Sequence, residues 1–109
     1  MSKFVATNNK GFQMTFENGF RISVQWGVSI YCQRKEDGEY GESMKTEFWE
    51  SNSAEIAVFN KDREFIGITN YPDVVAGWLS TDKVAKVITI VQSATTEEEI
   101  ETKLKALNI

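Results

Sequence analysis

The chain has 109 residues, with 16 acidic and 12 basic side chains, no histidine and a single cysteine. We expect one domain with one core, spanning residues 1–109. The lack of histidine excludes a Ser-His-Asp triad and histidine metal ligands, and a single cysteine excludes an internal disulfide and cysteine-rich metal clusters. The net charge of −4 argues against direct nucleic-acid binding, which usually requires a basic surface.

The sequence also indicates where the protein resides. Residues 1–9 contain no apolar run of signal-peptide length, and no segment approaches the roughly 20 apolar residues that cross a bilayer. The free Cys32 is typical of a reducing compartment. We therefore expect a soluble, cytoplasmic protein without a membrane partner.

Apolar residues alternate from residue 11 to residue 26, on both sides of Asn18-Gly19, which is typical of a β-hairpin. A two-residue loop would set each apolar row against a polar one, whereas a three-residue loop with Gly19 in the left-handed conformation sets apolar residues opposite each other. We therefore predict three apolar pairs: Phe16 with Phe20, Met14 with Ile22, and Phe12 with Val24. The opposite face is then polar, with Gln13, Thr15, Arg21, Ser23 and Gln25.

Further strands are expected after this hairpin. Residues 28–33 resume the alternation, and residues 46–50 form a short strand candidate. Residues 54–59 and 64–68 predict a second hairpin, with Val58 opposite Ile66 and Phe59 opposite Phe65. Both faces of this hairpin are apolar, so another element must cover one of them. Residues 74–79 are either a last short strand or a packed loop.

Two helices are expected at the C-terminal end. Ser80 or Thr81 can cap a helix over about 81–93, and Thr96 with Glu99 forms a capping box for a helix over about 97–107. The apolar stripes that would face the core are Val84, Val87, Ile88 and Val91 in the first helix, and Ile100, Leu104 and Leu107 in the second. The sequence thus predicts an α+β fold: an antiparallel β-sheet of five to six strands, over about residues 4–68, followed by two C-terminal helices packed on one face.

No catalytic or metal-binding pattern stands out. The acidic loop holds Glu36, Asp37, Glu39 and Glu42, but without the spacing of a calcium loop, so a solvated loop is the simplest interpretation and a partner-binding patch the functional one. Cys32 has no histidine to activate it, and we expect it to be a small core residue. No glycine pair matches a phosphate-binding loop. We therefore expect no enzyme, no cofactor and no metal.

The aromatic residues fall into two groups. Those of the first hairpin, Phe12, Phe16, Phe20 and Trp26, are explained by core packing. Five others lie near breaks in the pattern: Tyr31, Tyr40, Trp49, Tyr71 and Trp78. Burial is the simpler expectation for each of these five, but an exposed one would suit a protein interface or a base-stacking site.

Several segments together resemble a group of small bacteriophage proteins that has no assigned activity. They are Gly11-Phe12-Gln13-Met14-Thr15-Phe16-Glu17-Asn18-Gly19, Ser23-Val24-Gln25-Trp26-Gly27 with Tyr31-Cys32, residues 54–59, and Gly77-Trp78-Leu79-Ser80-Thr81-Asp82. The chain departs from this pattern at Arg63, where the resemblance implies glycine, and at Ser29-Ile30, where it implies Gly-Asn. Arg63 predicts a turn that is either mildly strained or re-formed, because the left-handed conformation costs a residue other than glycine about 1 kcal/mol.

Two functional hypotheses follow. In the first, a phage-type accessory protein acts without catalysis in the host cytoplasm, by binding and inhibiting a host protein such as a component of antiviral defence; its contact residues would be Glu36, Asp37, Glu39, Tyr40, Glu42 and Trp49. In the alternative, the protein sequesters a small molecule or nucleotide on its polar sheet face, through Arg21, Gln25, Tyr31 and Arg34. A homodimer is possible if the helices cover only one face of the second hairpin.

Overall fold

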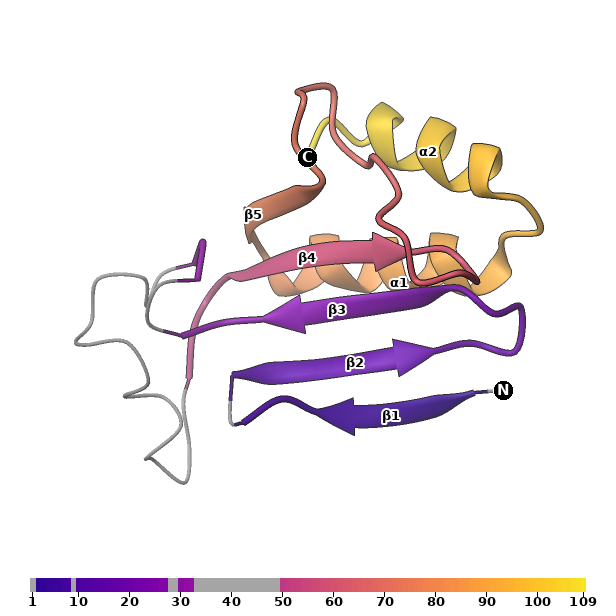
Figure 1. Ribbon diagram of the computed structural model, residues 1–109. Helices are drawn as coiled ribbons and strands as arrows, with labels where there is room; N and C mark the ends of the chain where they lie inside the picture. The colour runs from indigo at the N-terminus through magenta and orange to yellow at the C-terminus, as the bar shows by residue number, and fades with distance from the viewer. Residues whose placement is uncertain (1, 9, 28–29, 33–49) are drawn as a thin grey trace.

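The computed structural model describes residues 2–8, 10–27, 30–32 and 50–109 (Figure 1). In chain order the described residues form β1 (Lys3–Ala6), β2 (Gly11–Thr15), β3 (Arg21–Gln25), β4 (Ala54–Phe59), β5 (Val75–Leu79), α1 (Thr81–Ser93) and α2 (Glu97–Ala106). The strands make one antiparallel sheet in the order β1-β2-β3-β4-β5. The predicted α+β arrangement, a sheet followed by two helices, is therefore confirmed.

The first hairpin has the predicted register. Phe12 lies opposite Val24 and Met14 opposite Ile22, and the Phe16 amide donates to the Phe20 carbonyl at 2.9 Å. Gly19 has a φ of +89°, a conformation that is unfavourable for residues other than glycine. The three-residue loop thus allows apolar residues to share one face of the sheet.

Helix α1 covers this apolar face and lies behind β3 and β4 in Figure 1. The Ser80 side chain accepts a hydrogen bond from the Lys83 amide and begins the helix. Val84, Val87 and Val91 are buried, as the stripe predicts, while Ile88 is partly buried against the core. The stripe packs on the strands because its period of 3.6 keeps these residues on one side.

Helix α2 lies beside α1, with Ile100 and Leu104 buried and Leu107 partly buried. The Thr96 side chain accepts from the Glu99 amide at 3.1 Å, as predicted. The return bond of the capping box differs, because Glu99 Oε1 accepts from the Thr95 amide at 3.0 Å rather than from Thr96. The box therefore closes one residue earlier than the spacing indicated.

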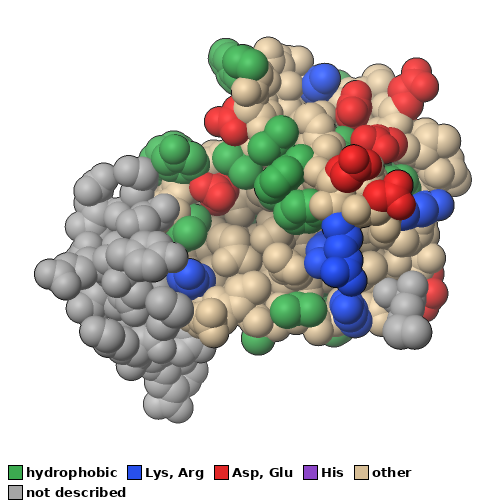
Figure 2. Space-filling model, viewed as in Figure 1, with side chains coloured by type: hydrophobic (Ala, Val, Ile, Leu, Met, Phe, Trp, Pro, Cys, Tyr) green, Lys and Arg blue, Asp and Glu red, His purple; other side chains and the backbone are tan. Residues whose placement is uncertain are grey.

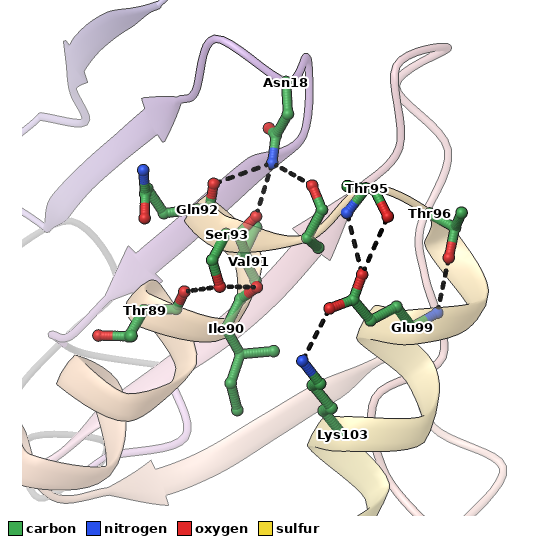
Figure 3. Close-up of polar contacts among 11 residues, drawn as sticks. Asn18, Thr89, Ile90, Val91, Gln92, Ser93, Thr95, Thr96, Glu99 and Lys103 are labelled. Carbon is green, nitrogen blue, oxygen red and sulfur yellow. Dashed lines mark hydrogen bonds and ion pairs between the residues drawn. The ribbon is translucent and has the colours of Figure 1, made fainter.

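Asn18 connects the hairpin turn to the end of α1 (Figure 3). Its Nδ2 donates to the carbonyl oxygens of Val91 at 2.9 Å, Gln92 at 3.2 Å and Ala94 at 2.9 Å. The last turn of α1 contains no basic residue. The amide of Asn18 instead donates to carbonyl groups at the end of the helix, where intrahelical partners run out.

Two strand predictions were wrong, and one open question is answered. Residues 30–32, within the expected strand 28–33, form a bend in which the Ile30 amide donates to the Gly27 carbonyl at 3.2 Å. Segment 64–68 is not a strand: it makes the predicted pair of Phe59 with Phe65 as a single bridge. Strand β5 pairs with residues 54–57 instead, so segment 75–79 is a strand and the sheet extends past residue 68. Of the candidate 46–50, only Glu50 is described, outside any strand.

Candidate functional site

The face of the sheet opposite α1 is the candidate functional site, and we call it the open face. Because side chains alternate along a strand, Arg21, Ser23 and Gln25 of β3 point to this side while Ile22 and Val24 point to the helix. Figure 2 views the molecule from the open face. It shows hydrophobic side chains gathered over β4 and β5, with lysine or arginine and acidic groups at the border.

The polar part of the open face is held together by its own side chains. Arg21 Nε donates to Thr15 Oγ1 at 3.0 Å, and Arg21 Nη1 donates to Gln13 Oε1 at 3.4 Å. Gln25 Nε2 donates to Ser23 Oγ at 3.1 Å, besides a bond to Thr7. The bonds to Thr15 and Gln13 orient the guanidinium of Arg21 on the sheet without a ligand.

Two stacked aromatic residues, Tyr31 and Trp78, lie at one end of the open face. Their ring centroids are 5.3 Å apart, and the residues are 43% and 58% exposed. The Trp78 amide donates to the Tyr31 carbonyl at 2.9 Å, and a Cβ added at Gly77 would lie only 2.6 Å from the Tyr31 Cβ. Gly77 is therefore needed where Tyr31 crosses β5.

The expectation that the aromatic residues near pattern breaks are buried is wrong for Tyr31, Trp78 and Tyr71, the last of which is 72% exposed. Tyr31 and Tyr71 lie in loops and Trp78 lies near the end of β5, where the described elements leave their side chains exposed. Cys32 and the first-hairpin aromatics follow the prediction: Cys32, Phe16 and Phe20 are buried, and Phe12 and Trp26 pack against the core.

A second aromatic pair continues this surface along β4. The rings of Phe59 and Phe65 are 4.7 Å apart, and Phe65 is 51% exposed. Val75 of β5 lies between the two pairs, opposite Ala57. We call these five residues, Tyr31, Phe59, Phe65, Val75 and Trp78, the aromatic band.

Opposite charges flank the two ends of the aromatic band. At the Trp78 end, Glu55 Oε2 accepts from the Tyr31 amide at 3.2 Å, and burial, together with the charge of Asp73, raises the pKa of Glu55. At the Phe65 end, four basic side chains surround a hollow of about 330 Å³, which we call the basic hollow. They are Lys3, Arg21, Lys61 and Arg63. Arg63 has a φ of +64°, so the turn keeps the left-handed conformation, which is the strained one of the two predicted alternatives.

The structure separates the residues predicted for small-molecule binding. Arg21 and Gln25 are at opposite ends of β3, about 13 Å apart at ordinary strand rise. Gln25 pairs with Glu55, whose carboxylate binds the Tyr31 amide, so Gln25 and Tyr31 share the acidic end. Arg21 therefore belongs to another region, and the carboxylates beside Tyr31 would repel an anion.

Other predicted contact residues lie outside the described residues: Arg34, Glu36, Asp37, Glu39, Tyr40, Glu42 and Trp49. Sequence reasoning also missed Lys3, Lys61 and Arg63, which are scattered along the chain and meet only in the folded sheet. The predicted pairing of Phe59 with Phe65, next to a turn containing Lys61 and Arg63, was the one signal that could have indicated the basic hollow.

A larger hollow of about 630 Å³ lies on the helix side of the sheet, between Phe12, Trp26, Leu79 and Ile88. Its lining is mostly apolar, and its one charged group among the described residues is the carboxylate of Glu50. It therefore suits neither a phosphate nor another anion. Within the described part of the chain, no group of three or more metal-ligating side chains converges, and no helix has the length and apolarity to span a bilayer.

Comparisons with protein-family models, with curated proteins and with solved structures find no match for this chain. The interpretation of the open face therefore depends on its own geometry.

Proposed function

We propose that this protein acts by binding another protein through its aromatic band, without catalysing a reaction. The observation that carries this proposal is Trp78, which is 58% exposed and stacked on Tyr31. Tryptophan and tyrosine supply much of the binding energy in protein interfaces, because they bury a large area with few rotatable bonds.

The backbone of Trp78 supports the same proposal. Its φ of +53° lies in the left-handed region, which costs a residue other than glycine or asparagine on the order of 1 kcal/mol. An exposed ring contributes little to the folded core, so core packing does not account for a tryptophan in this strained position. A ring that becomes buried only in a complex offers an explanation.

The charges beside Trp78 favour a particular kind of partner. Glu55 and Asp73 lie near the Tyr31 end of the band, so a partner with an apolar pocket and neighbouring lysine or arginine side chains would be complementary. The resemblance to bacteriophage proteins supports a host protein, such as a component of antiviral defence, as this partner. By occupying the surface of the host protein, the chain would mask that surface and so inhibit the host protein.

The experiment compares two single variants with the wild-type chain. Trp78→Gly removes the ring and accepts the left-handed backbone, so the fold should survive; Phe4→Ser is the control, since Phe4 is 79% exposed on β1. Immobilised proteins capture partners from bacterial lysate, and dissociation constants are then measured with the purified partner. We expect at least tenfold, or about 1.4 kcal/mol, weaker binding for Trp78→Gly and no change for Phe4→Ser.

Equal binding by Trp78→Gly and the wild type would contradict the proposal. Analytical ultracentrifugation of the isolated protein measures whether it forms a homodimer. A concentration-dependent dimer that Trp78→Gly abolishes would show that a second copy of the chain occupies the band, and would contradict a host partner at this surface.

A further inference from the structure

The basic hollow lies at the end of the open face away from Trp78. It draws on three separate parts of the chain, with Lys3 from β1, Arg21 from β3, and Lys61 and Arg63 from the turn after β4. Thr15, Gly19 and Asn60 complete its lining, which contains no carboxylate. In Figure 2, lysine and arginine side chains group on this part of the surface.

Among the described residues, the four cations of the hollow are not held in ion pairs, although Asp62 and Glu64 stand on either side of Arg63 in the chain. Two of the neighbouring carboxylates accept from uncharged groups: Glu17 accepts from Ser2 Oγ at 2.8 Å, and Glu64 accepts from Asn60 Nδ2 at 3.0 Å. Asp62 and Glu97 line an adjacent hollow that also includes Lys61. A bound anion would relieve the repulsion among the four cations.

Hydrogen bonds within the protein order two of the parts that carry the basic side chains: the guanidinium of Arg21 and the turn that contains Lys61 and Arg63. The bonds from Arg21 to Thr15 and Gln13 fix its guanidinium along the sheet. In the turn, Asn60 Oδ1 accepts from the Asp62 and Glu64 amides, each at 2.9 Å. A locked turn reduces the entropy lost when Lys61 and Arg63 close on a ligand.

We propose that the basic hollow binds adjacent phosphate groups of a small ligand. The Arg63 guanidinium can grip a phosphate through paired N–H donors, Arg21 can donate the N–H groups that it does not use for Thr15 and Gln13, and two ammonium groups add charge. A volume of about 330 Å³ suits a compact anion. A long polyanion is disfavoured, because the chain as a whole carries a net charge of −4.

The surroundings of the hollow favour a nucleotide as the source of these phosphates. Phe59 is the cross-strand neighbour of Arg21, and Phe65 stacks on Phe59 while remaining 51% exposed. A base could stack on Phe65 while the phosphate groups occupy the hollow. Phe65 also belongs to the aromatic band, so the base and a docked protein would share this residue, whereas the four basic side chains lie at the end of the band away from Trp78.

Calorimetric titration with ADP, inorganic pyrophosphate and adenosine tests the proposal. We expect ADP and pyrophosphate to bind, ADP more tightly, and adenosine to bind too weakly to measure. The double variant Lys61→Gln/Arg63→Gly should lower the affinity for both phosphate ligands at least about tenfold. Arg63→Gly also relieves the strained φ, so loss of folding is not expected.

The matched control is Lys83→Gln/Lys86→Gln, which removes the same charge from exposed positions on α1. Equal losses of phosphate affinity in the two double variants would mean that binding depends on the net charge of the protein alone, and would overturn the site. No binding of ADP or pyrophosphate at about 1 mM would also overturn it. Phe65→Ser separates the sources: a loss for ADP alone supports the nucleotide, whereas unchanged ADP affinity overturns the nucleotide and retains the phosphate site.

Discussion

The two faces of the sheet contain alternate residues of the same strands, yet their environments differ, although Ser23 and Ala57 are buried on the open face as well. On the helix side, Ile22, Ile56 and Val58 are fully buried against α1 and their neighbours. On the open face, polar side chains bond to one another and Trp78 and Phe65 remain exposed. The comparison teaches that packing explains one face and leaves the other face to be explained by binding.

The largest predicted effect is on the helix side. Ile56→Ala removes buried methyl groups and leaves a cavity, so we expect the free energy of unfolding to fall by about 3 kcal/mol. Phe65→Ala on the open face should lower it by less than about 1 kcal/mol, because Phe65 is half exposed. Urea denaturation of both variants measures the difference, and equal losses would remove the distinction between the faces.

Asn18 tests how the hairpin is fastened to the helix layer. Asn18→Asp replaces an amide donor by a negative charge beside the carbonyl end of α1, where the helix dipole is also negative. We expect a loss of about 2 kcal/mol, against about 1 kcal/mol for Asn18→Ala, which removes the donor without adding charge. An Asp variant as stable as the wild type in urea would show that these bonds do not stabilise α1.

Gly77 tests the aromatic end of the open face. Gly77→Ala places a Cβ 2.6 Å from Tyr31 Cβ, so we expect a loss of about 1 kcal/mol and displacement of Tyr31 from Trp78. The matched control is Gly67→Ala, because a Cβ added at Gly67 meets no atom within 4 Å. Tryptophan fluorescence and thermal unfolding report the two effects. If both alanine variants behave alike, Tyr31 does not constrain β5.

The smallest predicted effect concerns Glu99, on the exposed side of α2. The Lys103 ammonium, 2.7 Å away, and the Thr95 amide lower the pKa of Glu99 to about 2. Since its pKa is lower in the folded state, its stabilising contribution is present above pH 4.5 and is lost as the pH falls from 4.5 to about 2. We expect Glu99→Gln to flatten this part of a curve of stability against pH, and Glu98→Gln to leave it unchanged. A curve that keeps its slope in Glu99→Gln would contradict the assignment.

Much of the fold follows from local patterns in the sequence. The alternation around Asn18-Gly19 predicted the hairpin register, and the Ser80 and Thr96 caps predicted where both helices begin. These features depend on contacts between residues close in the chain. The predicted pairing of segment 64–68 with β4 is confirmed only near the turn, at Phe59 with Phe65 and at Val58 with Ile66. Segment 75–79 also has strand-like composition, and only long-range packing selects it as the strand that pairs with residues 54–57.

The candidate site was predicted only in part. Arg21 was predicted to be a binding residue, but its neighbours in the hollow were not. Lys3 comes from the first strand, and Lys61 and Arg63 come from a turn about forty residues after Arg21. Tyr31 was also identified, while its contact with Trp78 joins segments 47 residues apart. No periodic pattern encodes such contacts.

The sequence by itself determined the chemistry available to this protein, the alternation of its first hairpin and the ends of its helices, because these depend on composition and on short-range geometry. Only the tertiary structure decided which face of the sheet α1 covers and which face it leaves open. It also decided that Asn18 donates to carbonyl groups at the end of α1 and that four cations share one hollow. The physical reason is that burial and electrostatic repulsion depend on distances in space, which the order of residues does not specify.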